Sequence, residues 1–476
     1  MDKPNILLIT TDQQRFDTIC ALGNSKIYTP HLNWLVDEGI TYSNCYSDCP
    51  VCMPARATIM VGKAGYDTGL VSNNNNKIPM KNNPTLPSLL TKAGYQTRAQ
   101  GKMHFHPMRA NYGFEHMELP MDYYRDRCKN QKEGLPKQHG VGENEVEPVI
   151  STVDETDSLT YWTVERSIDF LETRDESRPF FMWTSFTKPH PPFDPCRNYW
   201  ELYANKDMPK PVYGDWSENI DDVPQGLLSS TYCLNSMYRF SEEQINDVRK
   251  AYYACITQID YSLGLLFARM REMDLLENTW IIFTTDHGEM LGDHHMGAKS
   301  VFLEGSAHIP FIVRPPAKSW APKPLGGIVC DDPISLVDVL PSILNMAGVE
   351  IPEGLDGTDI VKLVDLPQNR TFFGNHSDDF FMIKKNSIKY HLTSYDGAEL
   401  LFDLSTDPYE QKNLIGNSEY KDIHLELKAE LLEQIKYTRP DMIKDGELVT
   451  KPSKSCKEVN KWPGFHSIVV PTDVLH

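Results

Sequence analysis

The sequence predicts an α/β fold in which parallel strands are covered by helices, followed by a smaller C-terminal unit. Short apolar runs alternate with helical patterns through the first three quarters of the chain, and this alternation is typical of strand–helix–strand units. From about residue 371 onward the segments are shorter and alternate polar with apolar residues. That second pattern favours a small antiparallel sheet.

Four apolar runs are expected to form buried strands, because they are apolar on both faces. They are Asn5 to Thr10, Phe180 to Phe186, Thr279 to Thr284 and Pro310 to Val313. Helices are expected between them, at His31 to Glu38, Leu86 to Ala93 and Thr163 to Thr173. Glycine follows the first two helical patterns, which is a common way for a helix to end.

A domain boundary is expected near residue 365, in the polar stretch from Asp365 to Arg370. Beyond it, Thr371 to Leu404 predicts the antiparallel sheet, with a turn at Asp396-Gly397, and Ile423 to Tyr437 predicts a helix. The remaining tail is expected to wrap over the body in an extended form. We therefore divide the chain into an α/β domain, residues 1–365, and an α+β subdomain with its tail, residues 366–476.

The composition excludes some classes of partner. The 47 basic and 66 acidic residues give a net charge of −19, which disfavours nucleic acids and anionic membranes because both are themselves polyanions. No apolar run is long enough to predict a membrane span. The N-terminal segment does not have the pattern of a signal peptide, so we expect a cytoplasmic protein, or a secreted or periplasmic one if a leader has been removed.

Polar residues follow several of the apolar runs, at the strand ends where ligands of open α/β sheets collect. They are Asp12-Gln13, Lys102-Met103-His104, Lys188-Pro189-His190 and Asp286-His287. Each alone is more often a loop cap, but together they would bring carboxylates, an amide, imidazoles and lysine to one rim. Asp12, Gln13, Asp286 and His287 suit a hard divalent ion. The alternatives are a helix cap for Asp12 and a loop hydrogen bond for His287.

Three cysteines lie close together in the sequence, at Cys45, Cys49 and Cys52. A zinc site is disfavoured because no fourth ligand stands at a usual spacing, and free cysteines are often small buried apolar groups. Cys52 differs from the others in its surroundings, Cys52-Met53-Pro54-Ala55-Arg56.

This segment resembles the core motif of the sulfatase family, part of the alkaline phosphatase superfamily, which reads Cys-x-Pro-Ser/Ala-Arg. Other segments that resemble the family are Asp12 to Arg15, Gly101 to His104, Pro189 to Phe193, Asp286 to His294 with Lys299, Leu401 to Leu404 and Asp407 to Glu410. The resemblance covers most of the chain. It implies an alkaline phosphatase-like fold, with a large mixed, mostly parallel sheet flanked by helices and a smaller C-terminal subdomain of antiparallel sheet plus helix.

The resemblance also implies site roles. Cys52 would be oxidised to formylglycine by a maturation enzyme, and Arg56 would fix that residue. Asp12, Gln13, Asp286 and His287 would hold the metal beside residue 52. Ca²⁺ is favoured, with Mg²⁺ or Mn²⁺ as alternatives, because many sulfatases have Asp where Gln13 stands and Asn where His287 stands. The other implied site residues are Lys102 and Lys299 as ligands of the sulfate oxygens, His104 and His190 as proton carriers, and Asn73 as a further contact of the sulfate.

The expected reaction needs formylglycine, because a simple thiol or alcohol could not release the sulfate in its last step. The hydrated aldehyde has two hydroxyl groups, one of which can attack sulfur when a metal and a carboxylate activate it. Lys102, Lys299, Arg56 and the metal would offset charge on the sulfuryl oxygens, and His190 or Lys299 would protonate the leaving alcohol. The second hydroxyl, deprotonated by His104, would then expel sulfate and restore the aldehyde.

Three functions remain open at this point. The leading one is a sulfatase acting on a small molecule, with a sulfated mono- or disaccharide as first substrate and an aryl or choline-type sulfate as second. The others are a phosphonate monoester or phosphodiester hydrolase, and a silent binding protein in which Cys52 stays a thiol. Lys102 and His104 favour the sulfatase, because by resemblance the phosphonate hydrolases tend to carry uncharged hydroxyl residues there.

Several conspicuous residues receive a structural interpretation instead. His294-His295 are expected to be loop hydrogen-bonding residues, and Trp183 and Trp200 are expected to pack in the core or at the rim. Asn375 to Asp379 is a candidate rim segment for substrate selectivity.

Overall fold

The computed structural model describes residues 3–73, 77–127, 141–142, 144–228, 237–317, 327–363 and 369–452. The expected domain boundary at residue 365, the asparagines at 74–76 and the tail beyond residue 452 lie outside the described residues.

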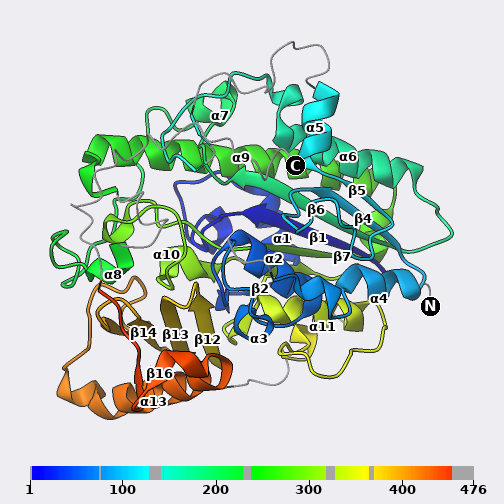
Figure 1. The fold of residues 1–476 in the computed structure, drawn as a ribbon. Coiled ribbons are helices and arrows are strands. Elements are labelled where there is room, and N and C mark those ends of the chain that lie inside the picture. Colours follow the sequence, from blue (N-terminus) through cyan, green and yellow to red (C-terminus); the bar gives the residue numbers. More distant parts are fainter. Residues whose placement is uncertain are drawn as a thin grey trace.

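Eight strands form the central sheet. They are β1 (Asn5–Asp12), β2 (Ile40–Tyr42), β4 (Gln96–Gly101), β5 (His116–Glu118), β6 (Phe180–Pro189), β7 (Thr279–Thr285), β9 (Ile312–Arg314) and β10 (Ile328–Cys330). Their order is β10-β2-β9-β7-β1-β6-β4-β5, and the strands from β7 to β5 in this order run parallel (Figure 1). Only β9 pairs antiparallel with both of its neighbours. The predicted large, mixed and mostly parallel sheet is confirmed.

The α-helices of the described residues are α1 (Pro30–Glu38), α2 (Cys52–Val61), α3 (Gly65–Thr68), α4 (Leu86–Lys92), α5 (Pro120–Arg127), α6 (Leu159–Thr173), α7 (Arg197–Glu201), α8 (Gln225–Leu228), α9 (Glu242–Glu272), α10 (Glu304–Ala307), α11 (Val339–Met346), α12 (Ile360–Leu363) and α13 (Lys421–Thr438). Figure 1 shows α6 and α9 along one face of the central sheet and α2, α4 and α11 along the other. The sheet is therefore covered by helices on both faces.

Strand β1 shows why the sheet is buried on both faces. Ile6 and Leu8 join one apolar cluster with residues of α2, α4 and α11, whereas Leu7 and Ile9 join a second cluster with residues of α1, α6 and α9. Because successive side chains of a strand point to opposite faces, an unbroken apolar run is what a sheet between two helical layers requires.

Helix α9 is the longest helix described, with 31 residues, and the sequence patterns did not single it out. Its start is well defined, since Ser241 and Gln244 form a capping box. Its buried face includes Arg249, Gln258 and Asp260 among the apolar residues. These polar side chains interrupt the apolar stripe that periodicity arguments depend on.

The C-terminal subdomain contains the expected antiparallel sheet of β12 (Thr371–His376), β13 (Phe380–Lys385), β14 (Ile388–Thr393) and β15 (Glu399–Asp403). The turn between β14 and β15 contains Asp396 and Gly397, with φ of 54° and 65°, the left-handed conformation that this dipeptide favours. Helix α13 packs on one face of the sheet through Leu427 and Leu431. The opposite face packs on the first domain, where Met382 contacts the cluster of Phe302 and Leu303.

Two smaller sheets complete the described strands. A three-stranded sheet has the order β11-β3-β8, from β3 (Cys45–Tyr46), β8 (His308–Ile309) and β11 (Ile334–Ser335). A two-stranded one joins β16 (Ile443–Lys444) and β17 (Glu447–Leu448).

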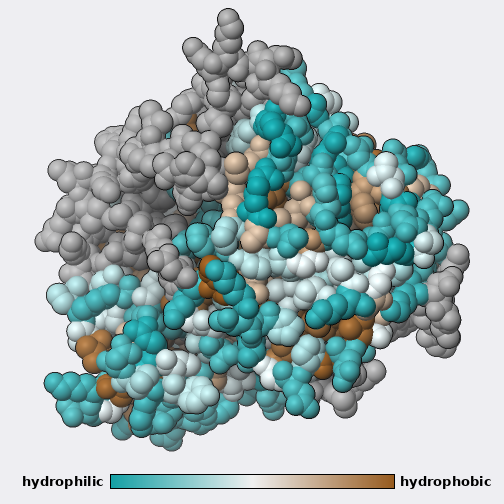
Figure 2. Space-filling model, turned by 45° about the vertical axis from the view of Figure 1, so that its right-hand side comes forward, coloured by the Kyte–Doolittle hydropathy of each residue, from teal (hydrophilic) through white to brown (hydrophobic). Residues whose placement is uncertain are grey.

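The face of the molecule in Figure 2 is mostly hydrophilic, with hydrophobic residues in small separate patches. Among the helices of the described residues, none has both the length and the apolar character that a membrane crossing needs.

Candidate active site

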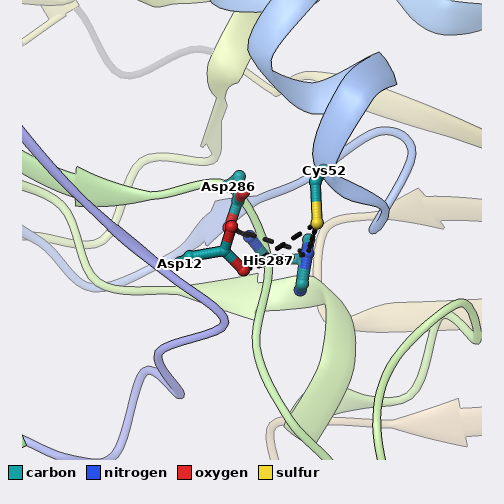
Figure 3. A group of neighbouring side chains, drawn as sticks. All are labelled: Asp12, Cys52, Asp286 and His287. Atoms are coloured by element: carbon teal, nitrogen blue, oxygen red, sulfur yellow. Dashed lines mark hydrogen bonds and ion pairs between the residues drawn. The ribbon is translucent and has the colours of Figure 1, made fainter. Parts of the chain in front are cut away.

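Four side chains from separate parts of the sequence meet at the carboxyl edge of the central sheet. Asp12 ends β1, Asp286-His287 follow β7, and Cys52 is the first residue of α2. Their potential ligand atoms all lie within 4.8 Å of one another, and Figure 3 shows the four side chains pointing toward a common point. The parallel pairing of β1 with β7 explains why Asp12 and Asp286 arrive at the same edge.

The thiol of Cys52 lies among charged groups. Its Sγ is 3.2 Å from Nε2 of His287, 3.8 Å from Oδ1 of Asp12 and 4.0 Å from Nζ of Lys102. Burial and Asp12 would raise the pKa of the thiol, but Lys102, Lys299 and His287 outweigh them and hold it well below its usual value. A buried thiol with a lowered pKa marks a functional cysteine more often than a structural one.

The two carboxylates differ in their surroundings. Burial would raise the pKa of Asp12, but Lys102 at 2.6 Å, His190 and Arg56 hold it well below its usual range. Burial and the charge of Asp12 raise the pKa of Asp286. Two buried carboxylates that repel one another are a fitting environment for a divalent cation, which neutralises both.

Arg56 lies one turn beyond Cys52 on α2 and is completely buried. Its guanidinium donates from Nε to Asp286 at 2.9 Å, pairs with Asp12 at 3.3 Å and donates to Oγ of Ser185 at 2.8 Å. The resemblance assigned Arg56 to the fixing of residue 52. The structure shows that Arg56 contacts both carboxylates and Ser185. It therefore also holds the helix that carries residue 52 against the carboxyl ends of β1, β6 and β7.

Gln13 has a φ of 72°, and its amide is held from both sides. Nε2 donates to the carboxylate of Glu289, and Oε1 accepts from Nζ of Lys299. Its backbone N–H donates to Oδ1 of Asp286 at 3.1 Å. No role for Glu289 was predicted from the sequence; the signal that could have found it is a carboxylate three residues after Asp286, in the same loop.

His190 is buried beside Asp12, and Lys299 is buried beside Gln13 and Cys52. Burial, Lys299 and Lys102 together hold the pKa of His190 well below its usual value, so the imidazole is neutral near pH 7. Its Nδ1 is 2.9 Å from the carbonyl oxygen of Pro191. Since a carbonyl only accepts, Nδ1 carries the proton and Nε2 is left as an acceptor.

For two further predicted site residues, His104 and Asn73, the structure shows the position but does not by itself assign a catalytic role. His104 follows β4 with a φ of 56°, and within the described residues its buried Nδ1 has no hydrogen-bond partner. Asn73 accepts the backbone N–H of Met53 at 3.0 Å, so it anchors its loop to the turn of α2 next to Cys52. Their contacts with substrate stay predictions.

The structural interpretations of His294 and Trp183 are confirmed. His294 lies 2.7 Å from Oγ of Ser217 and 3.2 Å from the carbonyl oxygen of Tyr409. Trp183 is fully buried and donates to Oγ1 of Thr10 at 2.8 Å. Cys45 and Cys49 are also buried, and the metal-capable group found among the described residues includes neither.

Known proteins resemble this chain over most of its length. The family model described as Sulfatase matches residues 4–349, and the model described as N-sulphoglucosamine sulphohydrolase, C-terminal, matches residues 292–437. An arylsulfatase of Clostridium perfringens is 32% identical over 483 aligned positions, covering 94% of this chain and 95% of that protein.

Two solved structures have the same fold. A phosphonate monoester hydrolase of Agrobacterium radiobacter aligns with a TM-score of 0.77 at 22% identity, covering 92% of this chain and 96% of that one. A protein solved in complex with its substrate D-glucosamine-2-N,6-O-disulfate aligns with a TM-score of 0.72 at 23% identity, covering 92% and 99%. Taken with the family match over residues 4–349 and the 32% identity to an arylsulfatase, the chain belongs to the sulfatase family and is a sulfuric ester hydrolase.

Proposed function

We propose that this protein hydrolyses the sulfate monoester of a small carbohydrate, using a formylglycine made from Cys52 and a divalent metal ion. One observation carries the proposal. Cys52 begins α2 inside a buried group of two carboxylates and an imidazole that can hold a metal, with the ammonium of Lys102 4.0 Å away. The proposed nucleophile would thus lie next to both the proposed metal site and Lys102, a cation that can bind the sulfate group.

The donor atoms fit a hard divalent ion. Oxygens of Asp12 and Asp286 and Nε2 of His287 would hold it, together with residue 52 and the amide oxygen of Gln13. The predominance of oxygen supports Ca²⁺, with Mg²⁺ or Mn²⁺ as alternatives. The hydrated formylglycine would supply a hydroxyl nucleophile, and the ion would lower the pKa of that hydroxyl.

The remaining residues have tasks that follow from their charges. Lys102 and Lys299 would pair with the sulfuryl oxygens and stabilise the charge that develops on them. An anion bound between these lysines offsets their effect on His190 and so raises the pKa of its imidazole, which suits a general acid for the leaving oxygen. His104 would act as the base that completes the cycle.

The choice of a sulfated carbohydrate is supported by relatives. A protein of the same fold has D-glucosamine-2-N,6-O-disulfate as its substrate, and the relative at 32% identity is an arylsulfatase. An aryl sulfate is therefore the second substrate class. Because formylglycine is made after translation, we also propose that a maturation enzyme is a partner of this chain.

A second candidate is a phosphonate monoester or phosphodiester hydrolase, because an enzyme with that name has the same fold. Sulfate monoesters, phosphodiesters and phosphonate monoesters with one common aryl leaving group separate the two candidates by kcat/KM. We expect matured enzyme to prefer the sulfate monoester, and a preference for the diester or phosphonate would overturn the proposal. A panel of sulfated sugars then tests the alcohol, which an aryl ester does not report.

A further inference from the structure

A buried cluster of charged residues lies where the C-terminal subdomain meets the first domain. Nζ of Lys389, in β14, pairs with the carboxylate of Glu304, in α10, and with Oε1 of Glu410 at 2.8 Å. The side chain of Lys389 is fully buried, and those of Glu304 and Glu410 are 7% and 1% exposed. The mechanism proposed above gives these three residues no task.

The subdomain holds α10 through this cluster. Oε2 of Glu410 accepts the backbone N–H of Glu304 at 2.7 Å. From the first domain, the carboxylate of Glu304 also accepts from the hydroxyl of Tyr46 at 2.9 Å and lies 2.7 Å from Nδ1 of His308. Glu304 is thus fixed between the two domains by partners on both sides.

Helix α10 in turn holds the loop that follows β7. The carbonyl oxygen of Gly305 accepts from the N–H of Glu289 at 2.7 Å, and that of Ser306 accepts from the N–H of Gly288 at 2.7 Å. The two segments are in close contact, because a Cβ atom added to Gly288 would lie 2.1 Å from the oxygen of Gly305. A shift of α10 must therefore move this loop.

The same loop orients two residues of the proposed metal site. The carbonyl oxygen of Gly288 lies 3.0 Å from Nδ1 of His287, which leaves Nε2 directed at Cys52. The carboxylate of Glu289 accepts from the amide of Gln13. Groups that fix the second nitrogen of a histidine ligand, or the orientation of an amide ligand, typically change metal affinity when they are altered.

We propose that Lys389 and Glu410 are positioning residues, through which the C-terminal subdomain sets the orientation of His287 and Gln13 by way of α10 and the loop after β7. This inference rests on the proposed function in taking His287 and Gln13 as metal ligands. Its physical basis is that removing one member of a buried ion-paired cluster leaves the others uncompensated, so the backbone attached to them rearranges.

Two substitutions at one position test the inference. Glu410→Gln keeps an oxygen for the N–H of Glu304 but loses the charge that pairs with Lys389, and Glu410→Ala loses both. Tyr46→Phe is a milder variant that removes only one donor to Glu304. The matched control is Arg370→Met, which removes another interdomain ion pair, Arg370 with Asp338 at 2.7 Å, where the partner Asp338 lies at the start of α11.

The measurement is the dissociation constant of metal-depleted protein for Ca²⁺, Mg²⁺ and Mn²⁺ by calorimetry, with the melting temperature of each variant alongside. We expect Glu410→Gln to weaken binding of the preferred ion about 10-fold and Glu410→Ala up to about 100-fold. Tyr46→Phe should change binding in the same direction by less. Arg370→Met should lower the melting temperature but leave the metal affinity within about threefold of wild type.

Each possible result leads to a different conclusion. If wild type binds an ion and Glu410→Gln binds it equally well, the inference is overturned while the proposed function stands. Weakening by Arg370→Met as large as by Glu410→Gln would also overturn it, since general destabilisation would then be the cause. A wild-type protein that binds none of the three ions contradicts the metal site itself, and the inference with it.

Discussion

The sulfur atom of Cys52 has an imidazole, a carboxylate and an ammonium as neighbours, all within 4.0 Å. This is an unusual place for a thiol that only fills space, because an apolar environment would raise its pKa, whereas here the nearby cations lower it. The side chain is small and begins a helix, so its loss removes the reactive group without opening a large hole in the core.

Cys52→Ala should therefore abolish turnover and leave the fold intact. The expected loss of kcat is at least about 10³-fold, because the nucleophile disappears while the binding groups stay. The measurement is steady-state turnover of an aryl sulfate, with circular dichroism as a control for folding. A folded variant with a substantial fraction of wild-type turnover would contradict covalent catalysis at residue 52.

Asp48 shows a different consequence of burial at the residue scale. Burial raises the pKa of its carboxyl group to about 6, above its value in the unfolded chain. Between these two pKa values the folded protein binds more protons than the unfolded one, so the ionised side chain costs stability above pH 6, and that cost falls as the pH falls.

Asp48→Asn removes this cost and keeps an oxygen that can accept the N–H of Gly65, now bonded to Asp48 at 2.8 Å. The gain in the free energy of unfolding should be about 1.5 kcal/mol larger at pH 8 than at pH 5. Urea unfolding at the two pH values measures it. A gain that is equal at both, or larger at pH 5, would show that Asp48 is not perturbed in this way.

At the scale of elements, the site depends on the contact between the loop after β7 and α10. Gly288→Ala places a methyl group 2.1 Å from a backbone oxygen, so the two segments must separate. We expect the variant to lose about 1–3 kcal/mol of stability and to lose activity, as His287 and Gln13 move.

Gly416→Ala is the control for this substitution. Its φ is 85°, but among the described residues no heavy atom beyond its two chain neighbours lies within 4 Å of the added Cβ. It should cost about 1 kcal/mol through backbone strain alone and leave kcat unchanged. Urea unfolding and steady-state kinetics of both variants test the argument, which fails if the two behave alike.

The elements nearest the site were also the most predictable. Strands β1, β6 and β7 follow from unbroken apolar runs, and the polar residues at their ends follow from the rule that ligands gather there. Helix α9 could not be predicted in the same way, because Arg249 and Asp260 lie on its buried face. Glu289 was missed because its role, holding the amide of Gln13, comes from a contact between residues 276 positions apart.

In the molecule as a whole, the C-terminal subdomain contacts the part of the first domain that supports the candidate active site. Its sheet packs on the first domain, and its charged residues Lys389 and Glu410 reach α10. Sequence patterns predicted the antiparallel sheet of this subdomain and its turn at Asp396-Gly397 but not this charged contact, because pairing between residues of distant segments leaves no local pattern. The expected cytoplasmic location stays a prediction, as does the domain division at residue 365.

The proposed function requires that Cys52 becomes formylglycine and that this residue carries the reaction. Mass spectrometry of the peptide containing residue 52, in active protein isolated from its native host, measures this modification. We expect the aldehyde or its hydrate at residue 52, in a fraction that rises in proportion to specific activity between preparations. Fully active protein with only unmodified cysteine at position 52 would contradict it.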